Sequence, residues 1–430
     1  MPENSPNESR NDKFDFINEK IKNKPFNTRR LLRRCLSTIG FAILFGIVAC
    51  FIITLLQPVM QQWLYPDRSK ISIPKDKVVK DTEEETEAKQ PDTQASAPVY
   101  ITETQQLELS DYQALQNKLY TIGEDANKSV VTVTGVKSDT DWFNSSYEKQ
   151  GQASGIIVAK NDSELLILTE KKVIAAAQTI SVTFSDNMQV NATLKKYDGN
   201  TGVAVLSVAL KDVSANTLSS ITVATLGNSY AVTKGSVVIA VGSPLGTNYS
   251  ILAGDITSTE NVISAFDVNY PIFTTDIMGN SNGNGVLINL EGQVVGLIMQ
   301  SYSTQDNQNT LTAVSISDLK EVIEKLSNGQ NIPYLGLKLS NVTDEIAKKY
   351  DVPKGVYISS VNMDSPAMAA GLQSGDIITE MDHTSISNVD DYTEKLYTLS
   401  KDSTVHFMVK RQGTHGYTKI NCTATVGVLQ

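Results

Sequence analysis

SPAMAAGLQSGDIITEMD, residues Ser365–Asp382, is the most informative stretch of this sequence. Its small residues after Ser365 allow a short helix to pack closely, and Gly375-Asp376 turns the chain into the apolar run that follows. Hairpin and helix signals surround it, including GVYISSV, SNVDDYTEKLYTL and TVHFMVKRQG. The pattern predicts an α+β module over residues 330–428, a usual size for one small domain.

The preceding region, residues 109–328, contains short β-branched runs separated by turn sequences. Closely spaced short strands with few helical segments predict an all-β barrel or sandwich. A helical segment, ISDLKEVIEKL, closes the region. The strand-like runs are SVVTVTGV, SGIIVA, LLILT, TISVTF, VAVLSVAL, SVVIAVG, GVLINL and QVVGLIM, and the turn sequences include NDS, DGN and EGQ.

Several of these motifs resemble those of the HtrA/DegP-type serine proteases. SPAMAAGLQSGDIITEMD, preceded by YLGL, is similar to the family's PDZ domain. AVGSPLG (Ala240–Gly246), TTDI (Thr274–Ile277) and VLINLEGQVVGLI (Val286–Ile298) are similar to its trypsin-like domain. The resemblance implies a mainly β fold, with a trypsin-like double β-barrel followed by an α+β PDZ domain. It also implies trimers that form through the protease domains.

An uncharged run begins at Cys35 and includes LSTIGFAILFGIVACFIITLL. About 20 apolar residues suffice to span a bilayer as a helix, so we predict a transmembrane helix over residues 35–57. A buried core helix is the alternative, but the length of the run and its lack of charge favour the span. Arginines on its N-terminal side place the N-terminus in the cytoplasm. These are Arg29, Arg30, Arg33 and Arg34.

This orientation makes residues 1–34 a cytoplasmic tail and puts the rest of the chain outside the cell membrane, held by a single span. Residues 58–108 are charged and contain Pro, Ser and Thr with little apolar periodicity. Such a composition predicts a disordered extracytoplasmic stalk.

Composition excludes some function classes. The formal net charge of −10 argues against a nucleic-acid surface, which needs clustered Lys and Arg. Cys35, Cys50 and Cys422 suggest no disulfide framework. We expect no cofactor and no metal site.

The chain has three histidines, His383, His406 and His415, and all lie in the C-terminal module. A hydroxyl nucleophile at neutral pH needs an adjacent base, for which imidazole is the usual group. A trypsin-like domain without histidine is therefore either inactive or dependent on another base.

The resemblance implies that different residue types occupy the positions of the family's catalytic histidine, aspartate and serine in this chain. LLILTEKKVI puts Lys172 at the histidine position, and DGNTGVAVLSV puts Gly202 at the aspartate position. Counting back from LINLEG puts Gly283 at the serine position. The backbone N–H groups of Gly283, Asn284 and Gly285 would form what remains of an oxyanion loop.

In an alternative alignment, the domain retains a serine nucleophile. GNS occurs at Gly279–Ser281, so a two-residue insertion before Val286 would make Ser281 the nucleophile, with Lys172 as its base. A lysine base must have its pKa lowered by burial, whereas Lys172 follows Glu170 and Lys171 in a polar turn. We therefore expect an inactive domain.

PDZ domains add a peptide strand to a sheet edge and capture its terminal carboxylate with backbone N–H groups. By resemblance, the capturing loop is Tyr334-Leu335-Gly336-Leu337. Val389, Tyr392 and Leu396 lie at helical spacing and are expected to form one wall of the groove. The alternative is that these three side chains belong to the core of the module.

The predicted function is that of a pseudoprotease. It would bind C-termini or unfolded segments of envelope proteins as an adaptor, sensor or regulator. We expect a homotrimer or a hetero-oligomer with an active HtrA-type paralogue. The alternative is an active serine endopeptidase of envelope protein quality control that uses Ser281 and Lys172.

Overall fold

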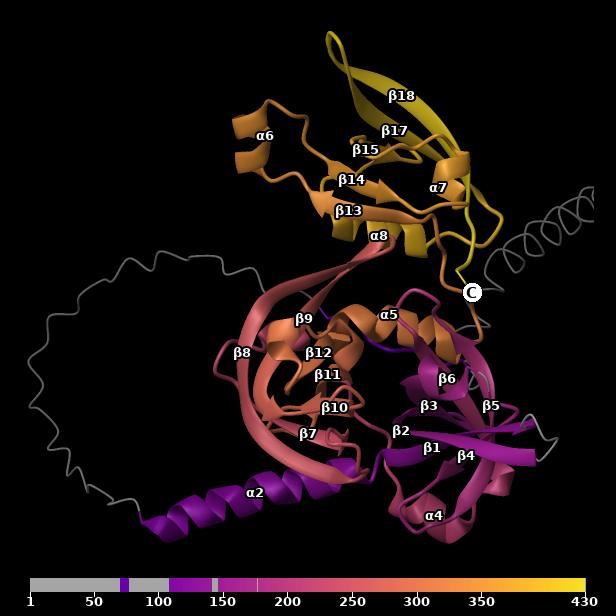
Figure 1. The fold of residues 1–430 in the computed structure, drawn as a ribbon, viewed down its shortest axis with the longest axis vertical. Coiled ribbons are helices and arrows are strands. Elements are labelled where there is room, and N and C mark those ends of the chain that lie inside the picture. Colours follow the sequence, from indigo (N-terminus) through magenta and orange to yellow (C-terminus); the bar gives the residue numbers. More distant parts are fainter. Residues whose placement is uncertain (1–69, 77–107, 141–145, 176, 430) are drawn as a thin grey trace, which may run out of the picture. The chain divides into compact units, whose positions relative to one another are not determined.

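Two closed β-barrels followed by an open sheet make up the fold (Figure 1), in a computed structural model that describes residues 70–76, 108–140, 146–175 and 177–429. This arrangement confirms the predicted mainly β class with a double barrel and a C-terminal module. The predicted tail, residues 1–34, and span, residues 35–57, lie outside the described residues. In the described ranges, no helix is both long and apolar enough to cross a membrane.

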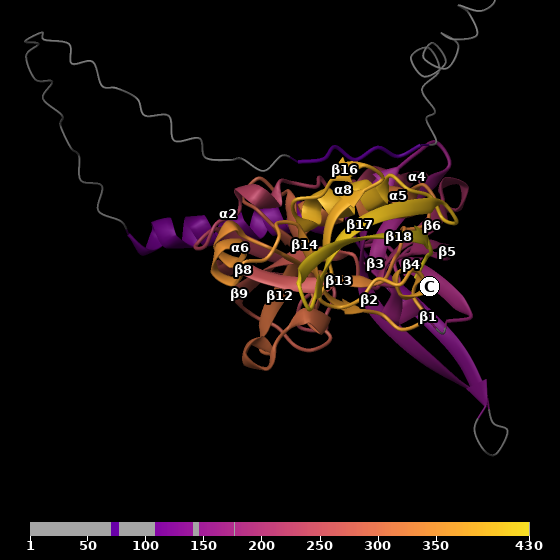
Figure 2. The same ribbon diagram turned by 90° about the horizontal axis from the view of Figure 1, so that it is seen from above.

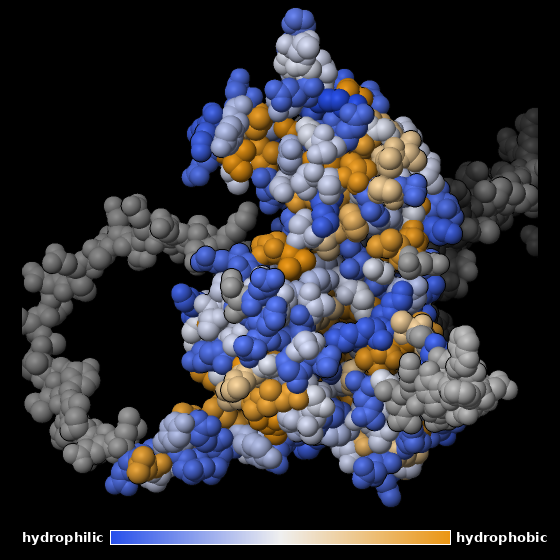
Figure 3. All heavy atoms as spheres, viewed as in Figure 1, coloured by the Kyte–Doolittle hydropathy of each residue, from blue (hydrophilic) through white to orange (hydrophobic). Residues whose placement is uncertain are grey.

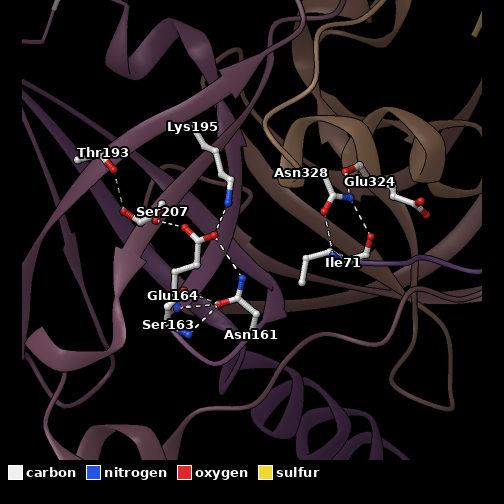
Figure 4. A network of polar contacts seen from close by, with 9 residues as sticks. All are labelled: Ile71, Asn161, Ser163, Glu164, Thr193, Lys195, Ser207, Glu324 and Asn328. Carbon is white, nitrogen blue, oxygen red and sulfur yellow. Dashed lines mark hydrogen bonds and ion pairs between the residues drawn. The ribbon is translucent and has the colours of Figure 1, made fainter. Parts of the chain in front are cut away.

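The first barrel closes in the strand order β1-β2-β3-β6-β5-β4. Its interior is built from β-branched and leucine side chains, as β3 (Glu164–Glu170) and β6 (Val203–Ala209) are apolar almost throughout. The carboxylate of Glu164 joins three strands because it accepts hydrogen bonds from Lys195 and Ser207 (Figure 4). The remaining elements are β1 (Val130–Thr140), β2 (Ser146–Lys160), α3 (Lys171–Ile174), β4 (Thr179–Thr183), β5 (Gln189–Tyr197), η1 (Leu210–Asp212) and α4 (Ala215–Ser220).

The second barrel closes in the order β10-β11-β12-β9-β8-β7. Helix α5 (Ile316–Ser327) follows it and buries Leu319, Val322, Ile323 and Leu326, which recur at helical spacing. The other elements are η2 (Ser229–Ala231), β7 (Val237–Ser243), β8 (Ser250–Ala265), β9 (Val268–Met278), β10 (Asn284–Ile288), β11 (Val294–Met299), η3 (Gln300–Tyr302), η4 (Gln305–Asn307) and β12 (Thr310–Ser315).

The C-terminal module is a sheet in the order β13-β14-β15-β17-β18, with β16 paired to β15. The hydroxyl of Ser365 accepts the Met368 N–H and so caps the short helix α7 (Pro366–Ala369), as a serine before a proline should. The other elements are β13 (Leu337–Asn341), α6 (Asp344–Tyr350), β14 (Val356–Val361), β15 (Ile377–Met381), β16 (Thr384–Ser385), α8 (Val389–Tyr397), β17 (Thr404–Gly413) and β18 (Gly416–Thr425).

Residues 70–76 run along α5 as an extended segment. Asn328 binds both backbone polar groups of Ile71, at 2.9 and 2.8 Å (Figure 4). The Ile73 N–H donates to the Glu324 carboxylate at 2.7 Å. Asp76 pairs with the buried Lys320 at 2.7 Å. The disorder predicted across residues 58–108 is therefore wrong for these seven residues, because α5 supplies the hydrogen-bond partners that the segment itself lacks.

Helix α2 (Leu109–Asn127) precedes the first barrel and was not predicted. It buries only Leu119 and Gly123 among mostly polar residues, so its sequence carries little helical periodicity. Hydrophobic residues lie on its surface, at the lower left of Figure 3, and Leu109 and Leu115 are among its exposed ones.

Candidate active site and peptide groove

Lys172 lies in α3, immediately after β3, where the resemblance places the family's histidine. Its ammonium is 2.6 Å from the Glu170 carboxylate; the Lys172 side chain is 45% exposed and that of Glu170 is 8% exposed. Burial raises the pKa of the Glu170 carboxyl, and the contact with Lys172 opposes this effect only in part. An ammonium held in an ion pair has no lone pair with which to accept a proton from a nucleophile.

Gly202 ends the turn between β5 and β6, where the resemblance places the aspartate. Asp198 shapes this turn because its carboxylate accepts the Asn200 N–H at 3.0 Å and the Thr201 hydroxyl at 2.7 Å. Burial raises the pKa of Asp198, opposed by these bonds. The Gly202 carbonyl accepts the Lys171 N–H at 2.7 Å, so the segments that carry Lys172 and Gly202 are in direct contact.

Gly283 directly precedes β10, where the resemblance places the serine. Its N–H donates to the Asn280 carbonyl at 2.8 Å, which occupies one of the expected oxyanion donors. A Cβ at Gly283 would lie 2.6 Å from the Pro244 carbonyl oxygen. Ser281 is exposed in the same turn. In the described part of the chain, neither Gly283 nor Ser281 is hydrogen-bonded to Lys172.

The other two residues of the expected oxyanion loop have structural roles. Asn284 accepts the Ser154 N–H at 2.7 Å, which connects β10 of the second barrel to β2 of the first. Gly285 has a φ of +126°, and a Cβ there would lie 2.2 Å from the Val241 carbonyl oxygen. Only glycine fits this approach of β10 to β7.

Sequence reasoning missed a polar cluster beside this connection. The Ser154 hydroxyl donates to the Asn248 side-chain oxygen at 2.6 Å, and the Asn248 amide donates to the Thr132 hydroxyl at 2.6 Å. An amide oxygen is a weak base, so this buried serine is not activated by its neighbours. Thr132 and Ser154 lie in β1 and β2, and Asn248 lies in the turn between β7 and β8. The three residues share no motif, so nothing in the sequence marked them.

The loop Tyr334-Leu335-Gly336-Leu337 encloses a carboxylate, and that carboxylate belongs to Asp267 in the turn between β8 and β9. Its Oδ2 accepts the N–H groups of Leu335 at 2.8 Å and Gly336 at 2.7 Å, and its Oδ1 accepts the Leu337 N–H at 3.1 Å. Gly336 reaches this geometry with a φ of +91°, which favours glycine. Asp267 is 2% exposed, and burial raises the pKa of its carboxyl while the loop N–H groups oppose that rise.

The three predicted groove residues of α8 are all buried, with exposures of 1% for Val389, 0% for Tyr392 and 0% for Leu396. The Tyr392 hydroxyl donates to Asp267 Oδ1 at 2.8 Å, so Tyr392 faces the loop. All three side chains, Tyr392 included, are also part of the buried hydrophobic core of the chain. Asp267 itself was not predicted, since a single aspartate in a hairpin turn carries no functional signal in the sequence.

This fold and this loop define a trypsin-like peptidase domain followed by a PDZ domain. Residues 153–297 match the trypsin-like peptidase domain family, and residues 333–421 match the PDZ domain family. The chain belongs to the HtrA-type serine protease family, as the sequence motifs indicated.

Two relatives show how similar the chain is to this family, and one solved structure shares its fold. The chain is 30% identical over 307 residues to the serine protease Do-like HtrA of Lactococcus lactis subsp. lactis (strain IL1403), covering 65% of this chain and 71% of the relative. It is 28% identical over 312 residues to the protein of the same name from Lactococcus lactis subsp. cremoris (strain MG1363), covering 67% and 75%. The fold is similar to that of the HtrA-type protease AlgW with decapeptide, with a TM-score of 0.53 and 22% identity, covering 72% of this chain and 98% of that one.

Proposed function

We propose that this HtrA-type chain is a catalytically inactive protease homologue that binds C-termini or unfolded segments of envelope proteins through its PDZ domain. One observation carries the inactive assignment: the trypsin-like domain contains no histidine. The pairing of Lys172, at the expected histidine position, with Glu170 at 2.6 Å disfavours its use as a base instead. Loss of a whole triad typically lowers turnover about a million-fold. Peptide hydrolysis would then be too slow to matter.

The alternative is an endopeptidase with Ser281 as nucleophile and Lys172 as base. Such a lysine must be desolvated to become a neutral amine. Lys172 is 45% exposed and ion-paired, which disfavours this role. Ser281 is exposed in its turn, and among the described residues no hydrogen bond joins it to Lys172.

Peptide binding is supported by the chemistry of the loop. Three consecutive backbone N–H groups, from Leu335, Gly336 and Leu337, converge on one carboxylate within 3.1 Å. This donor set suits the terminal carboxylate of a peptide that adds to the edge of the sheet. Ligands with a free, apolar C-terminal residue are therefore the proposed class.

The proposal includes the setting of the protein. Residues 35–57 would anchor it in the cell membrane, with residues 1–34 in the cytoplasm and both folded domains outside. It would act as an adaptor, sensor or regulator, as a homotrimer or together with an active HtrA-type paralogue. A hetero-oligomer would explain why the protease scaffold persists without its chemistry.

Three measurements on the purified full-length chain test the proposal. We expect no cleavage of unfolded casein and no labelling by a fluorophosphonate probe. Cleavage that Ser281→Ala abolishes would show that the chain is an active protease. For the PDZ domain, we expect binding of peptides with an apolar last residue and a free carboxylate. Equal binding of the amidated peptides would contradict capture of the terminal carboxylate.

A further inference from the structure

The carboxylate loop of the PDZ domain is saturated by the chain's own Asp267. The side-chain carboxylate accepts three loop N–H groups and, in addition, the Tyr392 hydroxyl at 2.8 Å. The terminal carboxylate of a peptide would need the same backbone donors. Asp267 is 2% exposed, so the loop has no room for a second carboxylate beside it.

The backbone of Asp267 also forms hydrogen bonds like those expected of a bound peptide strand. Its N–H donates to the Leu337 carbonyl at 2.6 Å, at the start of β13, and its carbonyl accepts the Thr393 hydroxyl of α8 at 2.9 Å. The side chains of Asn269 and Ser264 reach the Leu339 carbonyl at 3.3 and 3.5 Å. The β8–β9 turn thus occupies the space between β13 and α8, and Figures 1 and 2 show it reaching the module there.

A ring contact strengthens this docking. Phe266, the other residue of the two-residue turn, packs edge-on against Tyr334 of the loop with ring centroids 6.0 Å apart. Asp267 has a φ of +65°, a left-handed conformation that aspartate tolerates better than most residues. The turn therefore presents an apolar ring and a carboxylate side by side, the two features expected of an apolar peptide C-terminus.

We propose that Asp267 is a built-in ligand of the PDZ domain, so that docking of the β8–β9 turn and binding of a peptide C-terminus exclude each other. This inference rests on the proposed binding of C-termini and adds its regulation. The apparent affinity for a peptide is reduced by the fraction of molecules in which the loop is free. By linkage, a bound peptide displaces the turn as strongly as the turn opposes the peptide.

The test is a fluorescence anisotropy titration of the full-length chain with a fluorescein-labelled octapeptide ending in Ala-Leu-Val with a free carboxylate. Asp267→Asn keeps the shape of the side chain but turns an amide toward N–H donors. We expect it to bind the peptide about tenfold more tightly than the wild type, within the usual range of coupling between sites. Glu260→Gln removes a charge from an exposed position of β8 without altering the PDZ contact, and should match the wild type.

The outcomes separate the two proposals. If the wild type and Asp267→Asn bind the peptide equally, the proposal that Asp267 competes with peptides is wrong, whereas the proposed binding of C-termini is supported. If no variant binds it, the proposed function fails and the competition fails with it. Tyr392→Phe, which removes one donor to Asp267 and keeps the ring, is expected to raise the affinity in the same direction by a smaller factor. It tests the same competition if Asp267→Asn does not fold, as judged by circular dichroism.

Discussion

Asn200 binds both backbone polar groups of Phe266: its Nδ2 donates to the Phe266 carbonyl at 2.6 Å, and its Oδ1 accepts the Phe266 N–H at 3.0 Å. Asn200 belongs to the turn that ends at Gly202, the aspartate-equivalent position. Phe266 immediately precedes Asp267, whose carboxylate accepts the N–H groups of the loop Tyr334–Leu337. The turn of the first barrel and this loop of the PDZ domain are thus connected through two adjacent residues of the second barrel.

This connection predicts an effect of Asn200→Ala on peptide binding. The variant loses two hydrogen bonds between the first barrel and the β8–β9 turn, each worth about 1 kcal/mol net. A less firmly positioned turn should compete less well, so peptide affinity should rise by roughly three- to tenfold. The anisotropy titration measures this change. Asn216→Ala, at an exposed site in α4, serves as the control, and unchanged affinity in Asn200→Ala would contradict the prediction.

The two glycines at triad positions should differ in their tolerance of the family's residues. Gly202 has a φ of +79° with no atom within 4 Å of a Cβ, so Gly202→Asp should cost about 1 kcal/mol of backbone strain. At Gly283 a Cβ would lie 2.6 Å from a backbone oxygen, so Gly283→Ser must shift the turn and should cost about 2 kcal/mol or more. Thermal unfolding of both variants measures the difference.

Neither single variant should cleave casein, because the base and the orienting carboxylate are not both restored. Proteolysis by Gly283→Ser alone would mean that the histidine-equivalent position has been misassigned. A destabilisation of Gly202→Asp as large as that of Gly283→Ser would contradict the open space seen at Gly202.

Much of the fold could be predicted because it depends on local signals. The runs that became β3 and β6 are continuous β-branched and leucine segments, and such segments bury both faces in a closed barrel. The Ser365 cap and the Gly375 turn act within a few residues of themselves. Helix α2 could not be predicted, since few of its residues are buried and its amphipathic pattern is weak.

The site was less predictable, because it depends on contacts between distant parts of the chain. Tyr334–Leu337 could be assigned from the motif YLGL, but its partner Asp267 lies 68 residues from Leu335 in the sequence. Tyr392 meets the same carboxylate across 125 residues. Contacts between such distant residues arise from the packing of whole domains, so neither residue type nor spacing in the sequence predicts them.

The motif residue Asp376 should be essential to the stability of the PDZ domain. It is 0% exposed and receives two bonds from Arg411, from Nε at 2.6 Å and Nη2 at 2.7 Å. Arg411→Ala leaves a buried carboxylate without its counter-charge, which costs about 3 kcal/mol or more. Arg411→Lys should recover only part of this, because lysine cannot form the paired bonds. Urea unfolding of the full-length chain measures both.

An exposed ion pair in the same domain provides the control. Lys354 and Asp344 are 2.7 Å apart with side chains that are each 69% exposed. Lys354→Ala should lower the free energy of unfolding far less than Arg411→Ala does, because solvent screens such pairs. If Arg411→Ala were as mild as Lys354→Ala, the paired bonds to Asp376 would contribute little.

The two glutamates at the ends of β3 should respond to pH with opposite signs. Burial raises the pKa of Glu170, so its ionised form is disfavoured in the folded state. The stability that this residue contributes is then present at low pH and is lost as pH rises through its raised pKa. Glu170→Gln cannot ionise. It should gain stability relative to the wild type as pH rises from the ordinary titration range of a glutamate toward neutrality.

Glu164 is the matched control on the same strand. Burial disfavours its ionisation too, but the bonds from Lys195 and Ser207 outweigh burial and lower its pKa. The stability from Glu164 is present at neutral pH and lost as pH falls through its lowered pKa, so Glu164→Gln should be less stable than the wild type at about pH 7. The difference should shrink on acidification. Melting temperatures of the three proteins across this range distinguish the two cases: shifts of the same sign in both variants would mean that Lys172, rather than burial, governs the ionisation of Glu170.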